Sequence, residues 1–242
     1  MAGRIVPRWL KSRLVKKGLG FDQTRVFISA AFKIDREIIN FFANLNIHIF
    51  DIYGQTETAG PLTLDGMVMG KKVMVLVQND EIVVSGDCVM SGYYQNPEAN
   101  RQVFKQCEYE RIYHTGDTGR NINGKICWTG RMGDDGKMAN GEYITAERLY
   151  SLEEKIKKID NRIEEVMICF ENKPYNTALV FSRNHQDQDL KEKIRRELPK
   201  IGDGMTRIRK LALLDVAAME LTPTLKLKRK ATLEKLASAI DS

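Results

Sequence analysis

A glycine-rich stretch at residues 130–141 divides the chain into two halves with different sequence patterns. It carries four glycines among charged residues and almost no apolar side chain. Because glycine lacks a Cβ atom, such a stretch leaves the backbone free and favours a joint over a packed element. We therefore predict two domains, residues 1–131 and 132–242, connected by a hinge.

Helical and strand-like patterns alternate after this joint. The expected helices cover residues 145–158, 188–198 and 230–239, and the expected strands cover residues 165–170, 178–182 and 207–214. Roughly 110 residues with this order of elements predict a small, mobile α+β domain at the C-terminal end.

The first half opens with the pattern of a parallel sheet. Residues 25–31 predict a strand, and residues 46–51 predict a second strand that ends in a turn at Tyr53-Gly54. Residues 35–45 between them predict a helix with one apolar face formed by Ile38, Ile39, Phe42 and Leu45. A strand, a helix and a strand in this order form the repeating unit of α/β proteins. We therefore expect part of a parallel α/β sheet here.

The middle of the chain changes to short strands separated by tight turns. Residues 73–89 contain two β-rich runs, and Asn123-Gly124 is a strong hairpin signal between residues 118–122 and 125–129. This pattern predicts a small β-barrel or a twisted antiparallel sheet.

Charge and cysteine content limit the possible partners and compartment. The net charge of +6 over 242 residues favours a polyanionic partner, such as a nucleotide, a coenzyme, a nucleic acid or an anionic membrane surface. The four cysteines form no Cys-x-x-Cys pair, which disfavours a zinc site or a disulfide framework and fits a reducing compartment. Since no apolar run approaches the roughly 20 residues of a membrane span, we expect a cytoplasmic, unsecreted protein, with peripheral membrane association left open.

The first twenty residues are basic and contain no acidic residue. Two interpretations remain open, a mitochondrial presequence and a surface helix with Trp9, Leu10 and Leu14 facing inward. The helical spacing favours the second.

The run Tyr53-Gly54-Gln55-Thr56-Glu57-Thr58 follows the second expected strand. A hydroxyl and backbone donors suit a phosphate, a carboxylate oxygen suits Mg²⁺, and the tyrosine ring suits a purine. A polar cap at the end of a strand has the same composition, so this run alone does not distinguish a site from a turn.

His114-Thr115-Gly116-Asp117 is the second polar run. The Asp117 carboxylate could accept hydrogen bonds from the two hydroxyls of a ribose, and Arg131 adds a guanidinium beside the joint that suits ribose or phosphate oxygens. An Asx-type turn and a solvated arginine are the structural alternatives.

The third run is Leu221-Thr222-Pro223-Thr224-Leu225-Lys226-Leu227-Lys228-Arg229. Pro223 and Thr224 would fix a turn that presents one lysine to a cleft. A nucleic-acid patch is the alternative for so basic a run, but little aromatic interleaving accompanies it, so we expect no nucleic-acid partner.

In this order the three runs resemble the adenylate-forming superfamily of acyl-CoA synthetases, luciferases and peptide-synthetase adenylation domains. The chain is similar in particular to long-chain fatty acyl-CoA synthetases of the bubblegum branch. That similarity rests on Leu45-Asn46-Ile47-His48, on Gly141-Glu142-Tyr143-Ile144 and on the third run, and Gly92-Tyr93-Tyr94-Gln95-Asn96-Pro97-Glu98-Ala99 matches a further family motif.

The resemblance implies a ligase that works in two steps. A fatty acid attacks the α-phosphate of ATP, with Mg²⁺, to give an acyl-adenylate and diphosphate, and the thiol of coenzyme A then displaces AMP. Tyr53, in the ATP/AMP-binding run with Gly54 and Gln55, would contact adenine. Thr56 would contact the α-phosphate, and Glu57 would hold the magnesium ion.

The remaining implied roles fall to four residues. Asp117 and Arg131 would hold the ribose, and Gly141 would line the path of the pantetheine arm of coenzyme A. Lys226 would bridge the carboxylate and α-phosphate oxygens, which makes Lys226, Thr56 and Glu57 the expected catalytic residues.

The sequence departs from the family pattern at four places. The glycine-, serine- and threonine-rich phosphate loop and its lysine do not occur in it. Ala31-Phe32-Lys33 replaces a small-residue-and-proline turn at adenine, Gly133 replaces the usual aspartate or lysine of the hinge, and residues 61–72 look shortened.

We therefore expect the C-terminal portion of a synthetase, with the missing N-terminal portion as a partner. The alternative is a non-catalytic paralogue that binds a nucleotide or an acyl-adenylate.

Overall fold

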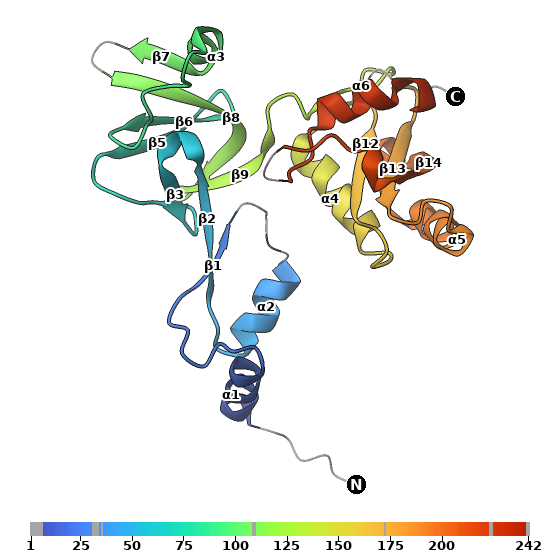
Figure 1. Cartoon of the computed structure of the whole chain (residues 1–242), viewed down its shortest axis with the longest axis horizontal. Helices are drawn as coiled ribbons and strands as arrows, with labels where there is room; N and C mark the ends of the chain where they lie inside the picture. The colour runs from blue at the N-terminus through green and yellow to red at the C-terminus, as the bar shows by residue number, and fades with distance from the viewer. Residues whose placement is uncertain are drawn as a thin grey trace. The chain divides into compact units, whose positions relative to one another are not determined.

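The computed structural model describes residues 7–30, 34, 36–107, 110–171, 173–222 and 225–240. Its contacts divide the chain into two compact units, Met1–Thr129 and Gly130–Ser242, shown in Figure 1. This division falls two residues before the boundary expected at residues 131 and 132. We call the two parts the first and the second unit and describe each by itself.

The first unit begins with the expected strand, helix and strand. Helix α1 (Arg8–Gly18) precedes β1 (Phe27–Ala30), α2 (Arg36–Asn44) and β2 (Ile49–Gln55), and β1 pairs with β2 in parallel, with Phe27 opposite Ile49. Strands β3 (Gly60–Leu64) and β4 (Met67–Val68) then extend the sheet antiparallel, in the order β1-β2-β3-β4. The parallel α/β pattern is confirmed.

Two details of this region differ from the expectation. Tyr53 and Gly54 lie inside β2, and the chain turns later, at the short helix Thr56–Thr58 and at Ala59 with a φ of 56°. Gly54 is required by close strand pairing, because a Cβ atom there would lie 2.2 Å from the carbonyl oxygen of Gly60. Of the residues expected to share one apolar face, Ile38 is 46% exposed, whereas Leu45 is 8% exposed.

The second sheet of the first unit is antiparallel. It contains β5 (Val73–Gln78), β6 (Glu81–Gly86), β7 (Phe104–Cys107), β8 (Glu110–Ile122) and β9 (Lys125–Arg131), in the order β5-β6-β8-β7, with β9 paired to β8. The expected hairpin is confirmed between β8 and β9, where Asn123 and Gly124 both have positive φ values of 54° and 82°.

Of the two forms expected for this region, an antiparallel sheet is present, and the small β-barrel is wrong. Among the described residues the strand pairings leave an open sheet that does not close. A barrel requires the end strands of the sheet to pair with each other, and the described residues show no pairing of β5 with β7 or β9. Instead, successive parts of the long strand β8 pair with different neighbours. Residues 110–113 pair with β7, residues 112–118 pair with β6, and the last part forms the hairpin with β9. The apolar core of this sheet is centred on Ile82 and Val84 of β6 and on Tyr113 of β8.

Helix α3 (Pro97–Val103), which precedes β7, was not anticipated from the sequence. The Asn96 side chain accepts a hydrogen bond from the backbone N–H of Ala99 at 3.0 Å, and Pro97 occupies the first turn. Asparagine at the N-cap followed by proline is a sequence signal for a helix start, and it was present in the motif around Tyr93.

The second unit is an α+β fold built on a three-stranded sheet, and every element expected for it is present. A short hairpin of β10 (Gly136–Lys137) and β11 (Tyr143–Ile144) comes first. Helix α4 (Ala146–Lys157), β12 (Glu165–Cys169), β13 (Asn176–Ser182), α5 (Gln188–Glu197), β14 (Ile208–Asp215) and α6 (Arg229–Ile240) follow. Strand β13 is central, antiparallel to β12 and parallel to β14.

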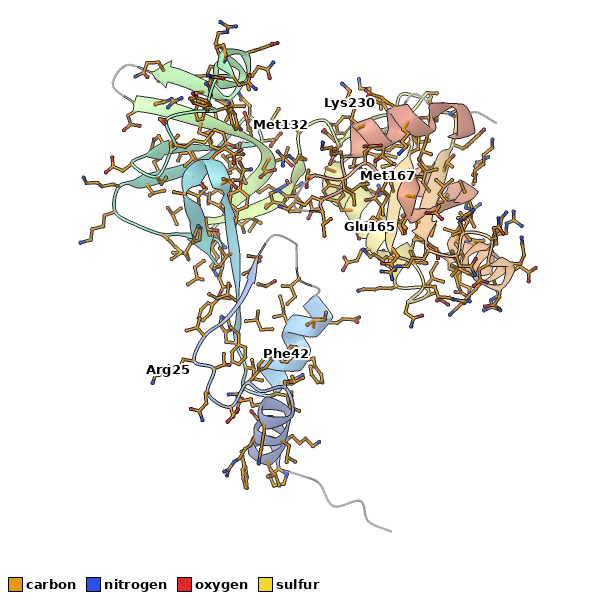
Figure 2. All side chains as sticks on the ribbon, viewed as in Figure 1. Arg25, Phe42, Met132, Glu165, Met167 and Lys230 are labelled. Carbon is orange, nitrogen blue, oxygen red and sulfur yellow. The ribbon has the colours of Figure 1, made fainter. Side chains whose placement is uncertain are left out.

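The sheet of the second unit has an apolar core on each face. Val166 and Ile168 of β12 point to one face, where they pack with residues of α4 and α5 such as Ile156 and Ile194. Met167, the intervening residue labelled in Figure 2, packs on the other face with Leu236 of α6. Because side chains alternate along a strand, both faces of the sheet carry apolar residues that pack against helices. In the described part of the chain, no helix is long and apolar enough to span a membrane.

Candidate nucleotide-binding site

The first candidate motif lies at the end of β2 and in the turn that follows it. Thr58 holds this turn, because its hydroxyl donates to the carbonyl of Gln55 at 2.9 Å and accepts from the N–H of Gln55 at 3.2 Å. The side chains of Tyr53 and Gln55 are half-buried, whereas Thr56 is exposed at the start of the turn. The local fold therefore presents the Thr56 hydroxyl to solvent and directs its two neighbours on β2 inward.

The second motif lies within β8 as a bulge. Val83 of β6 pairs with His114 and Glu81 pairs with Thr118, so residues 115–117 have no regular partners in the ladder. Gly116 takes a φ of 68° at this position, and its N–H donates to Oε1 of Glu81 at 3.0 Å. The motif is thus held in a strand irregularity, and the Asx-type turn considered for it is wrong.

Glu81 anchors this bulge and was not recognised from the sequence. Its second carboxylate oxygen, Oε2, lies 2.8 Å from Nδ1 of His114. The Thr115 hydroxyl donates to the carbonyl of Ile82 at 2.7 Å and accepts from the N–H of Asp117 at 3.0 Å. These contacts fix the direction of the Asp117 side chain.

The two motifs meet at the Asp117 carboxylate. The Tyr53 hydroxyl donates to Oδ2 of Asp117 at 2.9 Å, and Nε2 of Gln55 donates to the same oxygen at 2.5 Å. The Tyr113 hydroxyl, in turn, donates to the side-chain oxygen of Gln55. Side chains 62 and 64 residues apart in sequence therefore share one hydrogen-bonded cluster.

Burial shapes the electrostatics of this cluster. Asp117 is only 5% exposed and Tyr113 only 2%. Burial, with the nearby Asp117 carboxylate as the next cause, raises the pKa of Tyr53 well above its ordinary value. The phenol is therefore a neutral hydrogen-bond donor at physiological pH, and Asp117 is the acceptor that the surrounding donors orient.

Glu57 is held by a different set of contacts. The Tyr93 hydroxyl donates to its Oε1 at 2.7 Å, and the N–H of Met90 donates to its backbone carbonyl at 2.9 Å. Asn100 of α3 fixes Tyr93 by accepting from its N–H at 2.7 Å and donating to its carbonyl at 3.0 Å. Tyr93 and Asn100 were missed as supporting residues, although the family motif that contains Tyr93 was a signal.

The residues present fit a magnesium ion that arrives with a nucleotide. In the parts of the chain that are described, three or more histidine, cysteine or acidic residues do not gather into a metal-binding group. Mg²⁺ is commonly held by one or two carboxylates together with substrate phosphates and water, so one half-buried carboxylate at Glu57 is compatible with that mode.

Three of the expected site residues lie beyond Thr129 in the sequence, all at exposed positions. Arg131 is the last residue of β9. Gly141 has a φ of 85° in the turn between β10 and β11, where a Cβ atom would meet open space. Lys226 lies in a loop just before α6, and its N–H donates to the Thr222 hydroxyl at 3.0 Å.

Two of the sequence expectations fall outside the described residues. These are the suggested adenine-contacting turn at Phe32 and the turn at Pro223 and Thr224. The hydrogen bonds on either side of that second turn are described, since the N–H of Thr222 donates to the carbonyl of Lys226 at 2.8 Å.

Solved structures with the same fold are adenylation domains. The adenylation domain of a carboxylate reductase from Mycobacterium chelonae covers 98% of this chain with a TM-score of 0.73 at 18% identity, and the chain covers 42% of that domain. The corresponding domain from Segniliparus rugosus, in complex with AMP and a co-purified carboxylic acid, gives a TM-score of 0.71 at 18% identity, with 96% and 41% covered. The fold is that of the adenylate-forming enzymes.

Sequence comparison finds relatives of this chain among the long-chain-fatty-acid–CoA ligases. The long-chain-fatty-acid–CoA ligase heimdall of Drosophila melanogaster is 27% identical over 71% of this chain, which spans 27% of that protein. The ligase ACSBG1 of Bos taurus is 27% identical over 94% of this chain and 39% of its own length, and ACSBG2 of Rattus norvegicus is 32% identical over 54% and 21%. No protein-family model matches the chain.

The chain is thus a relative of the bubblegum-type long-chain-fatty-acid–CoA ligases, as its motifs indicated. It spans well under half the length of these relatives, which fits the expectation of a portion of such an enzyme.

Proposed function

We propose that this chain is the C-terminal portion of a long-chain fatty acid–CoA ligase that forms an acyl-adenylate from ATP. The observation that carries the proposal is the shared cluster of Tyr53, Gln55 and Asp117, in which two motifs expected to hold one nucleotide are joined by direct hydrogen bonds. Similarity to fatty acid ligases and to AMP-bound adenylation domains supports the choice of substrate class.

Each residue of the first unit has a role suited to its surroundings. The half-buried ring of Tyr53 offers a face to adenine. Asp117 accepts hydrogen bonds from the ribose hydroxyls, and the Arg131 guanidinium donates to ribose oxygens. The exposed Thr56 hydroxyl donates to the α-phosphate. Glu57 supplies a carboxylate oxygen to Mg²⁺, which would neutralise phosphate charge when bound.

The second unit supplies the residues that act on the reacting groups. Lys226 bridges the fatty acid carboxylate and the α-phosphate, which reduces the cost of bringing two anions together. Gly141 lines the path of coenzyme A. Rotation at the glycine joint would present these two residues in turn, so that adenylate formation and thioester formation use different orientations of one small domain.

A complete reaction requires donors for the β- and γ-phosphates, which the residues named here do not provide. We propose that a further N-terminal portion supplies a phosphate-binding loop and acts as the partner of this chain. Fatty acid, ATP and coenzyme A are the substrates, and a cytoplasmic location with peripheral attachment to an intracellular membrane suits an acyl-CoA product.

One observation favours a second candidate, a nucleotide-binding protein without catalysis. Asp117 is 5% exposed and already accepts two hydrogen bonds from side chains of the protein. A ribose must therefore add to or replace these bonds, and a nucleotide held in this way need not be placed for reaction. The two candidates differ in whether Lys226 matters.

Nucleotide binding is the first test, by calorimetric titration of the chain with AMP. We expect Asp117→Asn to weaken AMP binding at least about tenfold, since it removes the charge that accepts the ribose hydroxyls. Asp87→Asn, at an exposed aspartate paired with Lys72, is the matched control and should not change the affinity. Equal affinities for the wild type and Asp117→Asn would contradict the proposed site.

Catalysis is the second test, by diphosphate release with ATP and a long-chain fatty acid. We expect negligible release by the chain alone and restored release when the N-terminal portion of a bubblegum-type ligase is added. Lys226→Ala should then lower the adenylation rate about 100-fold or more, whereas Lys230→Ala should not. Rapid turnover by the isolated chain would refute the need for a partner, and AMP binding without turnover in the mixture would favour the second candidate.

A further inference from the structure

A buried ionic cluster lies in the second unit, outside the residues assigned above. The guanidinium of Arg229, the first residue of α6, donates to both carboxylate oxygens of Glu153 on α4, at 2.8 and 2.9 Å. The side chains of Arg229 and Glu153 are only 15% and 10% exposed. This bidentate pair is well satisfied, because the N–H of Ile168 on β12 also donates to Glu153 at 2.7 Å.

The cluster extends to the glycine joint. The Tyr150 hydroxyl donates to Oδ2 of Asp134, the residue that follows Gly133, and Nε of Arg229 lies 4.0 Å from the same oxygen. The guanidinium carbon of Arg229 is 5.7 Å from the centre of the Tyr150 ring. Burial and the Asp134 carboxylate raise the pKa of Tyr150, so that its phenol remains a donor.

The cluster also reaches the loop that carries Lys226. Arg229 is three residues beyond Lys226, and the N–H of Lys228 between them donates to the carbonyl of Glu220 at 2.8 Å. Leu221 and Leu227 form an isolated antiparallel bridge across this loop. The Arg229 guanidinium therefore ties the residue that follows this loop to α4 through Glu153 and to β12 through the carbonyl of Ile168, at 3.4 Å.

Charge is retained at Arg229 despite its burial. Burial disfavours the charged form, but the adjacent Glu153 carboxylate outweighs this and raises the pKa of Arg229 above its ordinary value. An apolar pair of similar volume would often stabilise a protein equally well. The polar cluster instead fixes the orientation of the Arg229 side chain, because a planar guanidinium and a carboxylate form two parallel hydrogen bonds in only one geometry.

We propose that Asp134, Tyr150, Glu153 and Arg229 form a positioning cluster that joins the exit of the hinge to the Lys226 loop, so that both move as one rigid body. This inference rests on the proposed function for the role of Lys226, but the mechanical coupling itself does not. None of the four residues is among those proposed to contact a reacting atom. They act through Lys226, because they determine how its side chain is oriented after the second unit rotates at the joint.

Coupling between the two ends can be measured without any catalysis. The test is amide hydrogen exchange on the full chain, read at two segments, residues 132–136 and residues 225–228. Tyr150→Phe removes only the hydroxyl at the hinge end, and Arg229→Lys removes the bidentate geometry at the loop end. Because coupling between two sites is reciprocal, each variant should affect both segments.

We expect exchange in both segments to accelerate about tenfold in either variant, while β12 and β13 remain protected. Two controls separate this from a general loss of stability. Arg148 also lies on α4 and forms an exposed ion pair with Asp203, and Arg148→Gln should not change hydrogen exchange in either segment. Ile194→Val lowers stability from the core of α5 without touching the cluster, and should not accelerate exchange selectively at the two segments.

The outcomes are distinct. Faster exchange only at the mutated end, or equally throughout the second unit, overturns the coupling. If Arg229→Lys does not fold, Tyr150→Phe still tests the coupling, because this variant keeps the aromatic ring at position 150 and the ion pair between Arg229 and Glu153. A third outcome combines selective acceleration of both segments in the variants with no adenylate formation by the wild-type chain mixed with the N-terminal portion. It would support the coupling and refute only the proposed function.

Discussion

The two ends of this chain bury their apolar side chains to very different degrees. In the region of α1, β1 and α2, Trp9 is 63% exposed, Ile28 and Phe41 are each 56% exposed, and Leu14 is 59% exposed. In the second unit, Ile156, Phe181 and Ile194 are completely buried. The expected first helix is present as α1, but the inward orientation expected for its Trp9 and Leu14 side chains is wrong.

The difference follows from sheet architecture. All-parallel sheets occur almost only with both faces covered, and the parallel part of the first unit, in the described residues, consists of β1 and β2 with α2 beside them. The three-stranded sheet of the second unit has helices on both faces. Amphipathic patterns are therefore satisfied in the second unit, whereas those of the first region lack elements to pack against.

The largest expected effect compares one buried and one exposed phenylalanine. Phe181→Ala should lower the free energy of unfolding by about 3–5 kcal/mol, because it leaves a cavity in a closed core. Phe41→Ala, the matched change in α2, should cost less than about 1 kcal/mol. Urea unfolding followed by circular dichroism measures both. Equal losses would show that the first region is packed as tightly as the second unit.

Acid should affect the second unit next most strongly, through Asp160. Its carboxylate accepts from Arg162 and, at 2.7 Å, from Lys193, and hydrogen bonding to these cations lowers its pKa well below the ordinary value. A lowered pKa stabilises the fold above the unfolded pKa of about 3.9, and that stability is lost as the pH falls from there through the folded pKa.

We therefore expect the melting temperature of the second unit to fall between about pH 4 and pH 2, with a shallower dependence in Asp160→Asn. Asp22→Asn, at an exposed position in the first unit, is the control and should leave the slope unchanged. A pH dependence identical in wild type and Asp160→Asn would contradict this assignment.

Self-association should reveal the uncovered region directly. Strand β1 ends its sheet in the described residues, and an apolar edge strand promotes pairing between chains. Ile28→Lys should weaken self-association about tenfold in sedimentation experiments, whereas Ile122→Lys, at the 51% exposed end of β8, should have little effect. A wild-type chain that sediments as a monomer at all concentrations would be inconsistent with this prediction.

The smallest effect should be the same in both units. Asn96 caps α3 in the first unit and Thr145 caps α4 in the second, each through one hydrogen bond to a backbone N–H. Replacement by alanine should cost about 1 kcal/mol in either case, because capping is a local interaction. Hydrogen exchange in the first turns of the two helices measures it. Markedly unequal costs would indicate that tertiary contacts also depend on one of these caps.

The sequence determined the features that depend on neighbouring residues. It predicted the elements of the second unit, the parallel strand-helix-strand of the first, and the Asn123-Gly124 hairpin, because periodicity and turn residues act within a few positions. It also indicated the relatives of the chain through short ordered motifs. The roles assigned to all of the site residues, from Tyr53 to Lys226, remain predictions.

Only the tertiary structure decided which side chains meet. The pairing of Tyr53 and Gln55 with Asp117, the anchoring of the bulge by Glu81, and the contact of Arg229 with Glu153 each join segments distant in sequence. The same applies to the open sheet around β8 and to the exposure of Trp9 and Ile38. Periodicity shows which face of an element is apolar, but whether that face is buried depends on the elements packed against it, which no local pattern specifies.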